Sequence, residues 1–315
     1  MTDKHTADAP ELRAAVDLGT NSALLLVGRV HGDGTIGVVE DHCMTPRLGA
    51  GLWRSGVLAA DARERTLEVL GLFAGRLKRL GIPAERQRAV ATAVLRKAGD
   101  AAEFMAQVRA ECGLELVVLS EQEEARLGFS AVAQGGGPVP GCVVDVGGGS
   151  TELVDRAGER RWSGPVGAVA LTERYLGLGG HPPLEAGGWA ALLGEVRGVF
   201  DSCPVTGEAG VGTPPGGVVA LGGTPGNLAC LMAEMEVFDH RLAEGREISA
   251  AAALAWAERL GALGVEERMD YAIEPGRAEI LPAGLACLGL ALGHLGVETA
   301  RASGRGLRYG LLRTD

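Results

Sequence analysis

The 315-residue sequence predicts an α/β protein made of two similar halves that face a common cleft. An order of three strands followed by alternating helices and strands occurs twice along the chain. Each occurrence carries the pattern D-x-G, at Asp17 and at Asp145, between two apolar strands. Because a duplicated hairpin with the same turn chemistry indicates two related units, we expect domains at residues 1–127 and 128–315. We expect that the last helix can pack back on the first domain.

The first half opens with strands on either side of a polar turn. Apolar runs flank the Gly/Thr/Asn/Ser cluster at residues 19–22, and a third strand is expected in TIGVVED. A helix is predicted over Asp61 to Leu80, because apolar residues recur at helical spacing before Gly81 and Pro83. The next expected elements are a strand in RAVATAVLR, a helix over Ala101 to Cys112, a strand in LELVVLS and a helix from Glu121.

The second half repeats this order. Strands are expected in GCVVDVGGGSTELVDR, RRWSGPVG and GVVALGG, and helices over Ala168 to Leu176, over Leu184 to Phe200 and from Thr224. The Gly- and Pro-rich segment from Thr206 to Gly217 is expected to be a flexible loop. The apolar run from Ile280 to Val297 contains Pro282, His294 and several glycines, so we interpret it as a buried core helix and not as a membrane span.

The charge balance, the cysteines and the first residues argue against several classes of function. Forty acidic against 30 basic residues give a net charge of -10, which argues against a broad binding surface for nucleic acid or for an anionic membrane. The six cysteines form no CxxC pair and show no zinc-finger spacing, so they are expected to be buried thiols in a reducing cytoplasm. The first residues lack the apolar core of a signal peptide, which also indicates a cytoplasmic protein.

The two D-x-G turns carry groups that suit phosphate. Glycine permits close approach of the backbone, and successive N–H groups and hydroxyl or amide side chains can donate to phosphate oxygens. The expected phosphate-contacting residues are Gly19, Thr20, Asn21 and Ser22 in the first turn and Gly147, Gly148, Gly149 and Ser150 in the second. Asp17 can hold Mg²⁺ directly or through water, and the second turn offers Asp145 with an additional carboxylate at Glu152.

A third glycine cluster follows a strand and opens a helix. Its N–H groups and the helix dipole favour an anion, although a strand-to-helix connection with a capping threonine would also explain it. Together with the two turns, it predicts a third wall of the same cleft, formed by Gly222, Gly223, Thr224 and Asn227.

Charged residues near the expected junction of the halves are candidates for catalysis. Arg96 stands where a strand runs into a helix, and a guanidinium there could pair bidentately with phosphate, although a solvated surface arginine fits the pattern equally well. Glu121, Glu123 and Glu124 begin a helix after Ser120, where acids commonly complement the helix dipole. A phosphate-hydrolysing site also needs a carboxylate that orients or deprotonates water, and this cluster could supply it.

Together these segments resemble the exopolyphosphatase and guanosine pentaphosphate phosphohydrolase family, the Ppx/GppA phosphatases. The resemblance covers nearly the whole chain, in the order AAVDLGTNSALLLV, ATAVLR, SEQEEARLGF, VVDVGGGSTEL, GAVALTERYL, ALGGTPGNLACL, ILPAGLACL and GLRYGLL. It implies duplicated ribonuclease-H-like domains of the superfold shared by actin, sugar kinases and heat-shock proteins, with an interdomain cleft that holds the substrate.

The resemblance also implies roles for residues. Glu124, directly before Ala125 and Arg126, matches the general base that activates the attacking water. Asp145 and Glu152 match acids associated with the metal, usually Mg²⁺ and alternatively Mn²⁺. The glycine-rich loops and Arg96 match phosphate-contacting groups. The implied substrate is polyphosphate or guanosine pentaphosphate, and a homodimer is compatible with the family.

The chain departs from the family pattern near its C-terminus. The family usually carries an Asp just before the R-G-L-R segment, where this chain has Gly304, so the anchoring of the last helix is an open question. No large helical extension follows, as in the short two-domain members, which predicts a preference for short polyphosphates. The choice between polyphosphate and guanosine pentaphosphate stays open. A sugar kinase, an actin-like ATPase and a non-catalytic sensor of these phosphates are the rival interpretations.

Overall fold

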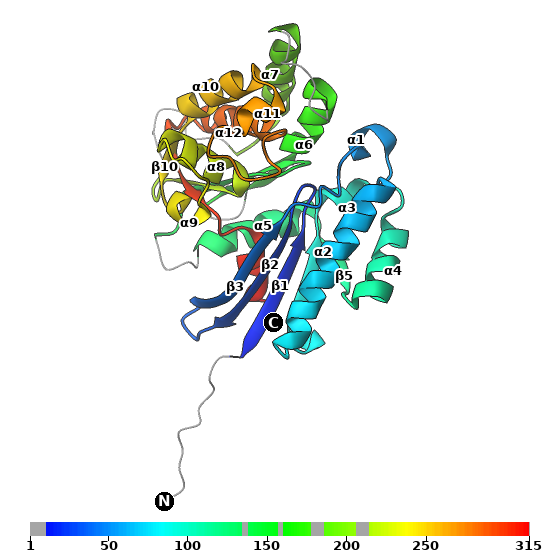
Figure 1. Ribbon diagram of the computed structural model, residues 1–315. Helices are drawn as coiled ribbons and strands as arrows, with labels where there is room; N and C mark the ends of the chain where they lie inside the picture. Colours follow the sequence, from blue (N-terminus) through cyan, green and yellow to red (C-terminus); the bar gives the residue numbers. More distant parts are fainter. Residues whose placement is uncertain (1–10, 134–137, 157–159, 178–185, 206–213, 315) are drawn as a thin grey trace, which may run out of the picture.

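The computed structural model describes residues 11–133, 138–156, 160–177, 186–205 and 214–314. Within them the chain forms two mixed β-sheets with helices packed on them, which confirms the predicted α/β class. Figure 1 shows the two sheets one above the other. We call the part built on the lower sheet the first half and the part built on the upper sheet the second half.

The first sheet has the strand order β3-β2-β1-β4-β5. Its strands are β1 (Leu12–Leu18), β2 (Ala23–Val30), β3 (Ile36–Met44), β4 (Gln87–Ala91) and β5 (Leu116–Val118). The helices of this half are α1 (Leu52–Ser55), α2 (Ala60–Arg79), α3 (Ala93–Lys97), α4 (Ala101–Cys112) and α5 (Glu121–Ala133), with a 3₁₀ turn at Ala84–Arg86. The first hairpin and the helices at 60–79 and 101–112 match the expected elements closely.

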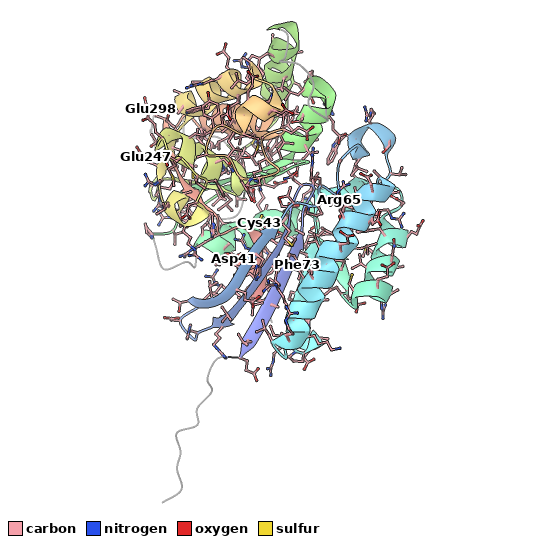
Figure 2. All side chains as sticks on the ribbon, viewed as in Figure 1. Asp41, Cys43, Arg65, Phe73, Glu247 and Glu298 are labelled. Atoms are coloured by element: carbon pink, nitrogen blue, oxygen red, sulfur yellow. The ribbon has the colours of Figure 1, made fainter. Side chains whose placement is uncertain are left out.

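Alternate residues of β1 face different helical layers, as the period of a β-strand requires. Val16 packs with Phe73 of α2 (labelled in Figure 2) and Phe104 of α4. Ala15 faces the opposite layer, where it packs with residues of α5 and of the C-terminal helix α13 (Leu307–Leu312). Asp17, two residues after Ala15, therefore belongs to the face that α5 and α13 cover.

The second sheet has the strand order β10-β11-β9-β6-β7-β8. Its strands are β6 (Cys142–Val146), β7 (Thr151–Asp155), β8 (Arg161–Gly164), β9 (Val218–Leu221), β10 (Glu247–Ser249) and β11 (Thr299–Ser303). Its helices are α6 (Ala168–Leu171), a π-helical turn (Thr172–Leu176), α7 (Ala186–Phe200), α8 (Gly223–Met232), α9 (His240–Ala243), α10 (Ala250–Gly261), α11 (Val265–Arg268) and α12 (Leu281–His294).

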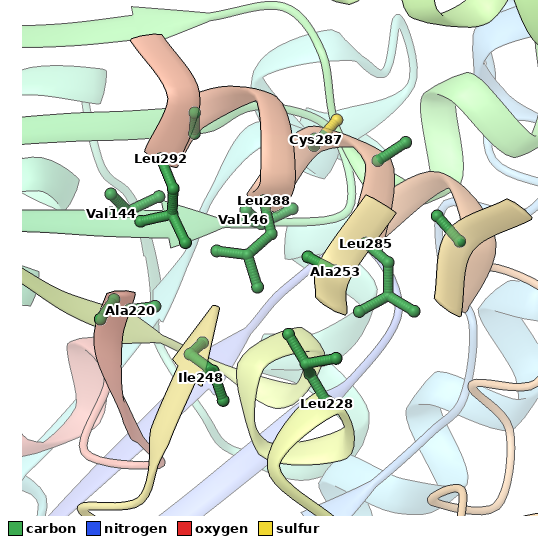
Figure 3. Packing of buried hydrophobic residues seen from close by; sticks show 14 of the residues in the cluster. Val144, Val146, Ala220, Leu228, Ile248, Ala253, Leu285, Cys287, Leu288 and Leu292 are labelled. Carbon is green, nitrogen blue, oxygen red and sulfur yellow. The ribbon is translucent and has the colours of Figure 1, made fainter. Parts of the chain in front are cut away.

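The largest core lies between this sheet and α12. Figure 3 shows Val144 and Val146 of β6 opposite Leu288 and Leu292 of α12. Helix α12 is buried along almost its whole length, in agreement with the prediction of a core helix at 280–297. Among the described residues, no helix is long and apolar enough to cross a membrane.

Helix α5 lies between the two sheets and contributes to the core of each. Its Leu127 packs against the first sheet together with α13. Its Ala125 packs against Val143 and Val219 of the second sheet. A helix buried on two sides in this way has a fixed position relative to both halves, so the residues in its first turn are also held in place.

Helix α13 packs on β1, β2 and α5, which means that the end of the chain returns to the first half. The segment leading to it is anchored although Gly304 stands where the resemblance implies an Asp. Glu244, at the end of α9, accepts hydrogen bonds from the Ser303 hydroxyl at 2.9 Å and from the Gly304 N–H at 2.7 Å. An acid from another part of the chain thus supplies the local anchor.

Several expectations need correction or lie outside the described residues. The short polar strands β10 and β11 were not anticipated, and they complete one edge of the second sheet. Cys43 is exposed and Cys112 is only half-buried, whereas Cys142, Cys203, Cys230 and Cys287 are buried as expected. The expected helix start at Leu184 and most of the expected loop at 206–217 fall outside the described residues.

Candidate active site

A cleft between the halves is lined by both D-x-G turns, by the start of α8 and by the first turns of α5 and α13. The two turns have the same backbone geometry. The Gly19 N–H donates to the Ser22 carbonyl at 2.9 Å, and the Gly147 N–H donates to the Ser150 carbonyl at 2.9 Å. This identity supports the duplication that the sequence indicates.

The two turns touch each other across the cleft. A side chain at Gly148 would place its Cβ only 2.7 Å from the Cβ of Thr20, so glycine is required for this approach. Thr20, Asn21 and Ser22 are buried. The side-chain Oδ1 of Asn21 has no hydrogen-bond partner although it is buried, which leaves an acceptor available beside the cleft.

The third glycine cluster contributes its first two residues to the cleft. Gly222 adopts a φ of 96°, which favours glycine, and a Cβ there would lie 3.5 Å from Oδ1 of Asp145. Thr224 and Asn227 are buried behind this wall and do not line the cleft. Asn227 donates to the Gly223 carbonyl at 2.8 Å and accepts from the Glu274 N–H at 2.7 Å, so it ties two loops together.

The structure brings the predicted acids together in one electrostatic cluster. Burial, followed by the charge of Glu124, raises the pKa of Asp17 to about 7. The same two causes raise the pKa of Asp145 to about 7. Burial, with Glu124 and Asp145 next, also raises the pKa of Glu152. Each acid therefore favours its neighbour's protonated form in the absence of a cation.

Glu152 lies behind the cleft surface. It stands directly opposite Asp145 in the β6–β7 pair, and it is 3% exposed. Its Oε1 accepts a hydrogen bond from the Ser163 hydroxyl at 2.8 Å. It therefore lies behind Asp145 and is not among the residues that line the cleft.

The acids at the start of α5 divide into two roles. Glu123 accepts hydrogen bonds from both the backbone N–H and the hydroxyl of Ser120, at 2.9 and 2.7 Å, which is a helix cap. Glu124 lines the cleft instead. The general explanation that such acids complement the helix dipole thus suffices for Glu123 but not for Glu124.

Arg96 holds Glu124 and does not itself line the cleft. Its Nη1 donates to Oε2 of Glu124 at 2.8 Å and to the Leu119 carbonyl at 2.8 Å. Burial raises the pKa of Glu124, and Arg96 opposes this effect. Arg96 is predicted from the sequence to contact phosphate. In this structure its guanidinium holds the carboxylate of Glu124, the candidate base.

The donor set suits a hard divalent cation only in part. In the described part of the chain, no group of three Asp, Glu, His or Cys side chains is arranged to hold a metal ion. Mg²⁺ commonly takes only one or two carboxylates and completes its shell with water and substrate phosphates. Asp17 and Asp145 line the cleft with oxygen donors and raised pKa values, so they fit a cation held in this way.

Two arginines that are not among the predicted site residues line the cleft. Arg277 follows the left-handed Gly276 in the loop before α12, and its Nη2 lies 3.5 Å from the Ser22 hydroxyl. Arg308 comes from the first turn of α13. The residues Thr92, Ala93, Gly306 and Leu307 also line the cleft. Arg277 and Arg308 lie more than 100 residues from either turn, so no local pattern could have placed them there.

Comparisons with known proteins identify the family and the fold. The model of the Ppx/GppA phosphatase family matches residues 27–315. The chain is similar to an exopolyphosphatase-like protein of known structure, with 26% identity, a TM-score of 0.86 and 97% of each chain covered. It is also similar to the Ppx/GppA family member of Aquifex aeolicus, with 27% identity, a TM-score of 0.73 and 96% of each chain covered. An exopolyphosphatase from Cytophaga hutchinsonii shares the fold at 19% identity, with 96% of each chain covered and a TM-score of 0.78.

Proposed function

The chain belongs to the Ppx/GppA phosphatase family, and on that premise we propose that it releases the terminal phosphate of inorganic polyphosphate, with short chains preferred. The fold is the predicted duplicated, actin-like α/β superfold. One observation carries the proposal: Glu124 lines the same cleft as the two D-x-G turns, which meet at Thr20 and Gly148.

The turns are proposed to hold the phosphates. Residues 19–22 and 147–150 line the cleft together with Gly222 and Gly223. The backbone N–H groups proposed to contact phosphate are those of residues 20–22 and 148–150, because the Gly19 and Gly147 N–H groups donate within their own turns. Such N–H groups bind anions without adding charge, which suits a chain with a net charge of -10. Arg277 places a guanidinium beside the Ser22 hydroxyl. A guanidinium in this position can donate hydrogen bonds to a phosphate oxygen.

Glu124 is proposed to be the general base. Its carboxylate takes a proton from water as the water oxygen attacks the terminal phosphorus. The bond from that phosphorus to the bridging oxygen breaks, and the shortened chain leaves with the electron pair. A raised pKa makes Glu124 a better proton acceptor than an ordinary carboxylate, and the hydrogen bond from Arg96 keeps it oriented.

A divalent cation is proposed to complete this site. Asp17 and Asp145 would hold it at the cleft surface, with Glu152 directly behind Asp145. When bound, Mg²⁺ or Mn²⁺ would neutralise phosphate charge and polarise the phosphorus. Guanosine pentaphosphate carries a terminal phosphoanhydride as well, so the same site could act on it.

The test is a variant of Glu124 on two substrates. Glu124→Gln keeps the shape of the side chain but cannot accept the proton, so we expect kcat to fall by about 10²–10⁴-fold with little change in KM. Release of phosphate should be measured on tripolyphosphate and on guanosine pentaphosphate. Glu123→Gln is the matched control, because glutamine also serves as a helix cap there and the charge change is the same.

The outcomes separate the candidate functions. Faster release from tripolyphosphate supports the proposal, whereas faster release from guanosine pentaphosphate would favour the nucleotide as substrate. Tight binding of both with no turnover in Mg²⁺ would identify a sensor. Turnover that requires an acceptor sugar would identify a kinase. A loss confined to KM in Glu124→Gln would assign that residue to binding.

A further inference from the structure

Arg308 lies inside the cleft although it belongs to the last helix of the chain. Its side chain is 11% exposed. Its Nε donates to Oδ1 of Asp41 at 3.0 Å, and its Nη2 donates to Oδ2 of the same carboxylate at 3.0 Å. This fork-to-fork pair fixes the plane of the guanidinium, because both bonds must keep their direction.

The strand register explains why Arg308 and Asp17 are neighbours. Asp41 of β3 pairs with Leu26 of β2, which pairs with Ala15 of β1. Ala15 faces the layer of α5 and α13, and Asp17 faces the same layer one step further along β1. Figure 2 shows Asp41 on β3, in the first sheet. Arg308, on α13, therefore lies over the sheet face that carries both acids.

The position of Arg308 is held by several contacts of α13. The Tyr309 hydroxyl donates to Oδ2 of Asp41 at 3.1 Å. A Cβ at Gly310 would lie only 2.3 Å from the Leu127 carbonyl oxygen, so glycine sets the close approach of α13 to α5. Arg313 donates from Nε to the Gly34 carbonyl at 2.9 Å. The guanidinium is thus presented from a rigid support.

The bonds to Asp41 leave part of the guanidinium available. An arginine has five N–H donors, and Asp41 uses two of those of Arg308. Burial acts against the charge of Arg308, but Asp41, Tyr309 and Asp17 together raise its pKa. Arg308 therefore stays charged, and it lowers the pKa of Asp17 against the larger effects of burial and Glu124.

We propose that Arg308 is a phosphate-binding residue of the cleft, and that Asp41 and Tyr309 are positioning residues that aim its free N–H groups at an internal phosphate of the substrate. The ligand class is a phosphoanhydride chain. This inference rests on the proposed function for its substrate. Its contact, Arg308, is additional to the phosphate contacts already predicted in the two turns, in the third loop and at Arg96. It makes the end of the chain part of the binding site.

A purely structural role for the Arg308–Asp41 pair predicts a different effect of mutation on stability and binding. If Arg308 only fastened α13 to β3, its loss would lower stability and reduce kcat and affinity together. A phosphate contact instead raises KM and weakens binding in a protein of normal stability. Binding and stability measured on the same variants therefore decide between the two.

The central variant is Arg308→Lys, which keeps the charge but cannot form the fork with Asp41 and donate to phosphate at once. Asp41→Asn and Tyr309→Phe perturb the support without touching the proposed contact. The matched control is Glu40→Gln, because Glu40 lies next to Asp41 on β3 and also pairs with an arginine, Arg76, but does not line the cleft.

The measurement is calorimetric binding of tripolyphosphate, with KM and thermal unfolding on the same preparations. We expect Arg308→Lys to bind about 10–100-fold more weakly, the range that loss of a charge-assisted hydrogen bond gives. Asp41→Asn and Tyr309→Phe should weaken binding less, with kcat nearly unchanged. Glu40→Gln should bind normally. Binding is measured without turnover, so a failure of the proposed hydrolysis would not hide the result.

Three results would overturn the proposal. The first is normal tripolyphosphate affinity in a folded Arg308→Lys protein. The second is a loss seen with guanosine pentaphosphate alone, because the shared phosphoanhydride chain is the proposed ligand. If Arg308→Lys does not fold, Asp41→Asn and Tyr309→Phe decide, and normal affinity in both of these folded variants would be the third.

Discussion

Replacing Gly148 by alanine should separate the two D-x-G turns. In the structure a Cβ at this position would lie 2.7 Å from the Thr20 Cβ, 3.1 Å from the Thr20 Cγ2 and 3.1 Å from the Val169 Cγ2. Carbon atoms that are not bonded rest at about 3.5–4.0 Å, so the turns must move apart by roughly 1 Å. The contacts come from both halves, and no single flexible side chain can absorb the change.

The expected loss follows from this displacement. A misplacement of roughly 1 Å in a catalytic site costs about 10²-fold in rate, because the reacting groups leave their productive geometry. Overpacking a close contact also costs about 1–3 kcal/mol of the free energy of unfolding. We therefore expect Gly148→Ala to lower kcat/KM for tripolyphosphate by about 10²-fold and to remain folded.

The assay needs a control glycine that has room for a methyl group. Gly198 lies exposed in α7, and a Cβ there would meet nothing within 4 Å. Gly198→Ala should leave turnover unchanged and should stabilise the protein by about 0.5–1 kcal/mol, since alanine favours a helix. Wild-type turnover and stability in Gly148→Ala would refute the close approach of the turns on which the cleft depends.

Two further predictions concern the cation and the length of the substrate. Phosphate release should stop after exhaustive chelation and return with Mg²⁺ or Mn²⁺, because Asp17 and Asp145 are expected to hold the cation; full activity in the chelated protein would contradict this. A long polyphosphate should shorten gradually as a population on a gel, since a net charge of -10 repels the distal part of the chain between cuts. Full-length chains beside free phosphate, with no intermediates, would show processive action instead.

The two turns could be predicted from the sequence because their signal is local. Apolar runs on either side of D-x-G specify a hairpin, and the repeat at Asp17 and Asp145 specifies two of them. Both hairpins form with the same register, since each Asp stands one residue before the end of its strand. Strand period and turn chemistry were sufficient for this part of the site.

The remaining residues depend on contacts that are distant in sequence. Arg308 reaches the cleft because α13 packs on the first sheet, and Glu244 anchors the segment before it from another helix. Strands β10 and β11 were missed because they are short and contain charged residues at Glu247 and Arg301, without the apolar alternation of a strand. Tertiary packing, and not local preference, determines these features.

Arg96 shows how far a local prediction extends. The sequence predicts Arg96 where a strand runs into a helix, and in the structure it lies in α3, which follows β4. Sequence position cannot show which acceptor a guanidinium finds. The structure pairs it with Glu124 and with the Leu119 carbonyl. The role predicted for Arg96 as a phosphate contact remains a prediction.

The two hairpins differ in the acids that they carry. In the first, Asp17 pairs across the strands with Leu24, whereas in the second Asp145 pairs with Glu152. A duplicated unit that kept the same fold therefore has a second acid beside its Asp in one copy only. Because the charge of Glu124, on the helix between the sheets, acts on Asp17 and on Asp145 alike, the proposed base is shared by the halves while the acid pair is not. Strand register thus places a second acid, on β7, opposite an Asp that both copies retain, and this side chain makes the acids of the two hairpins unequal.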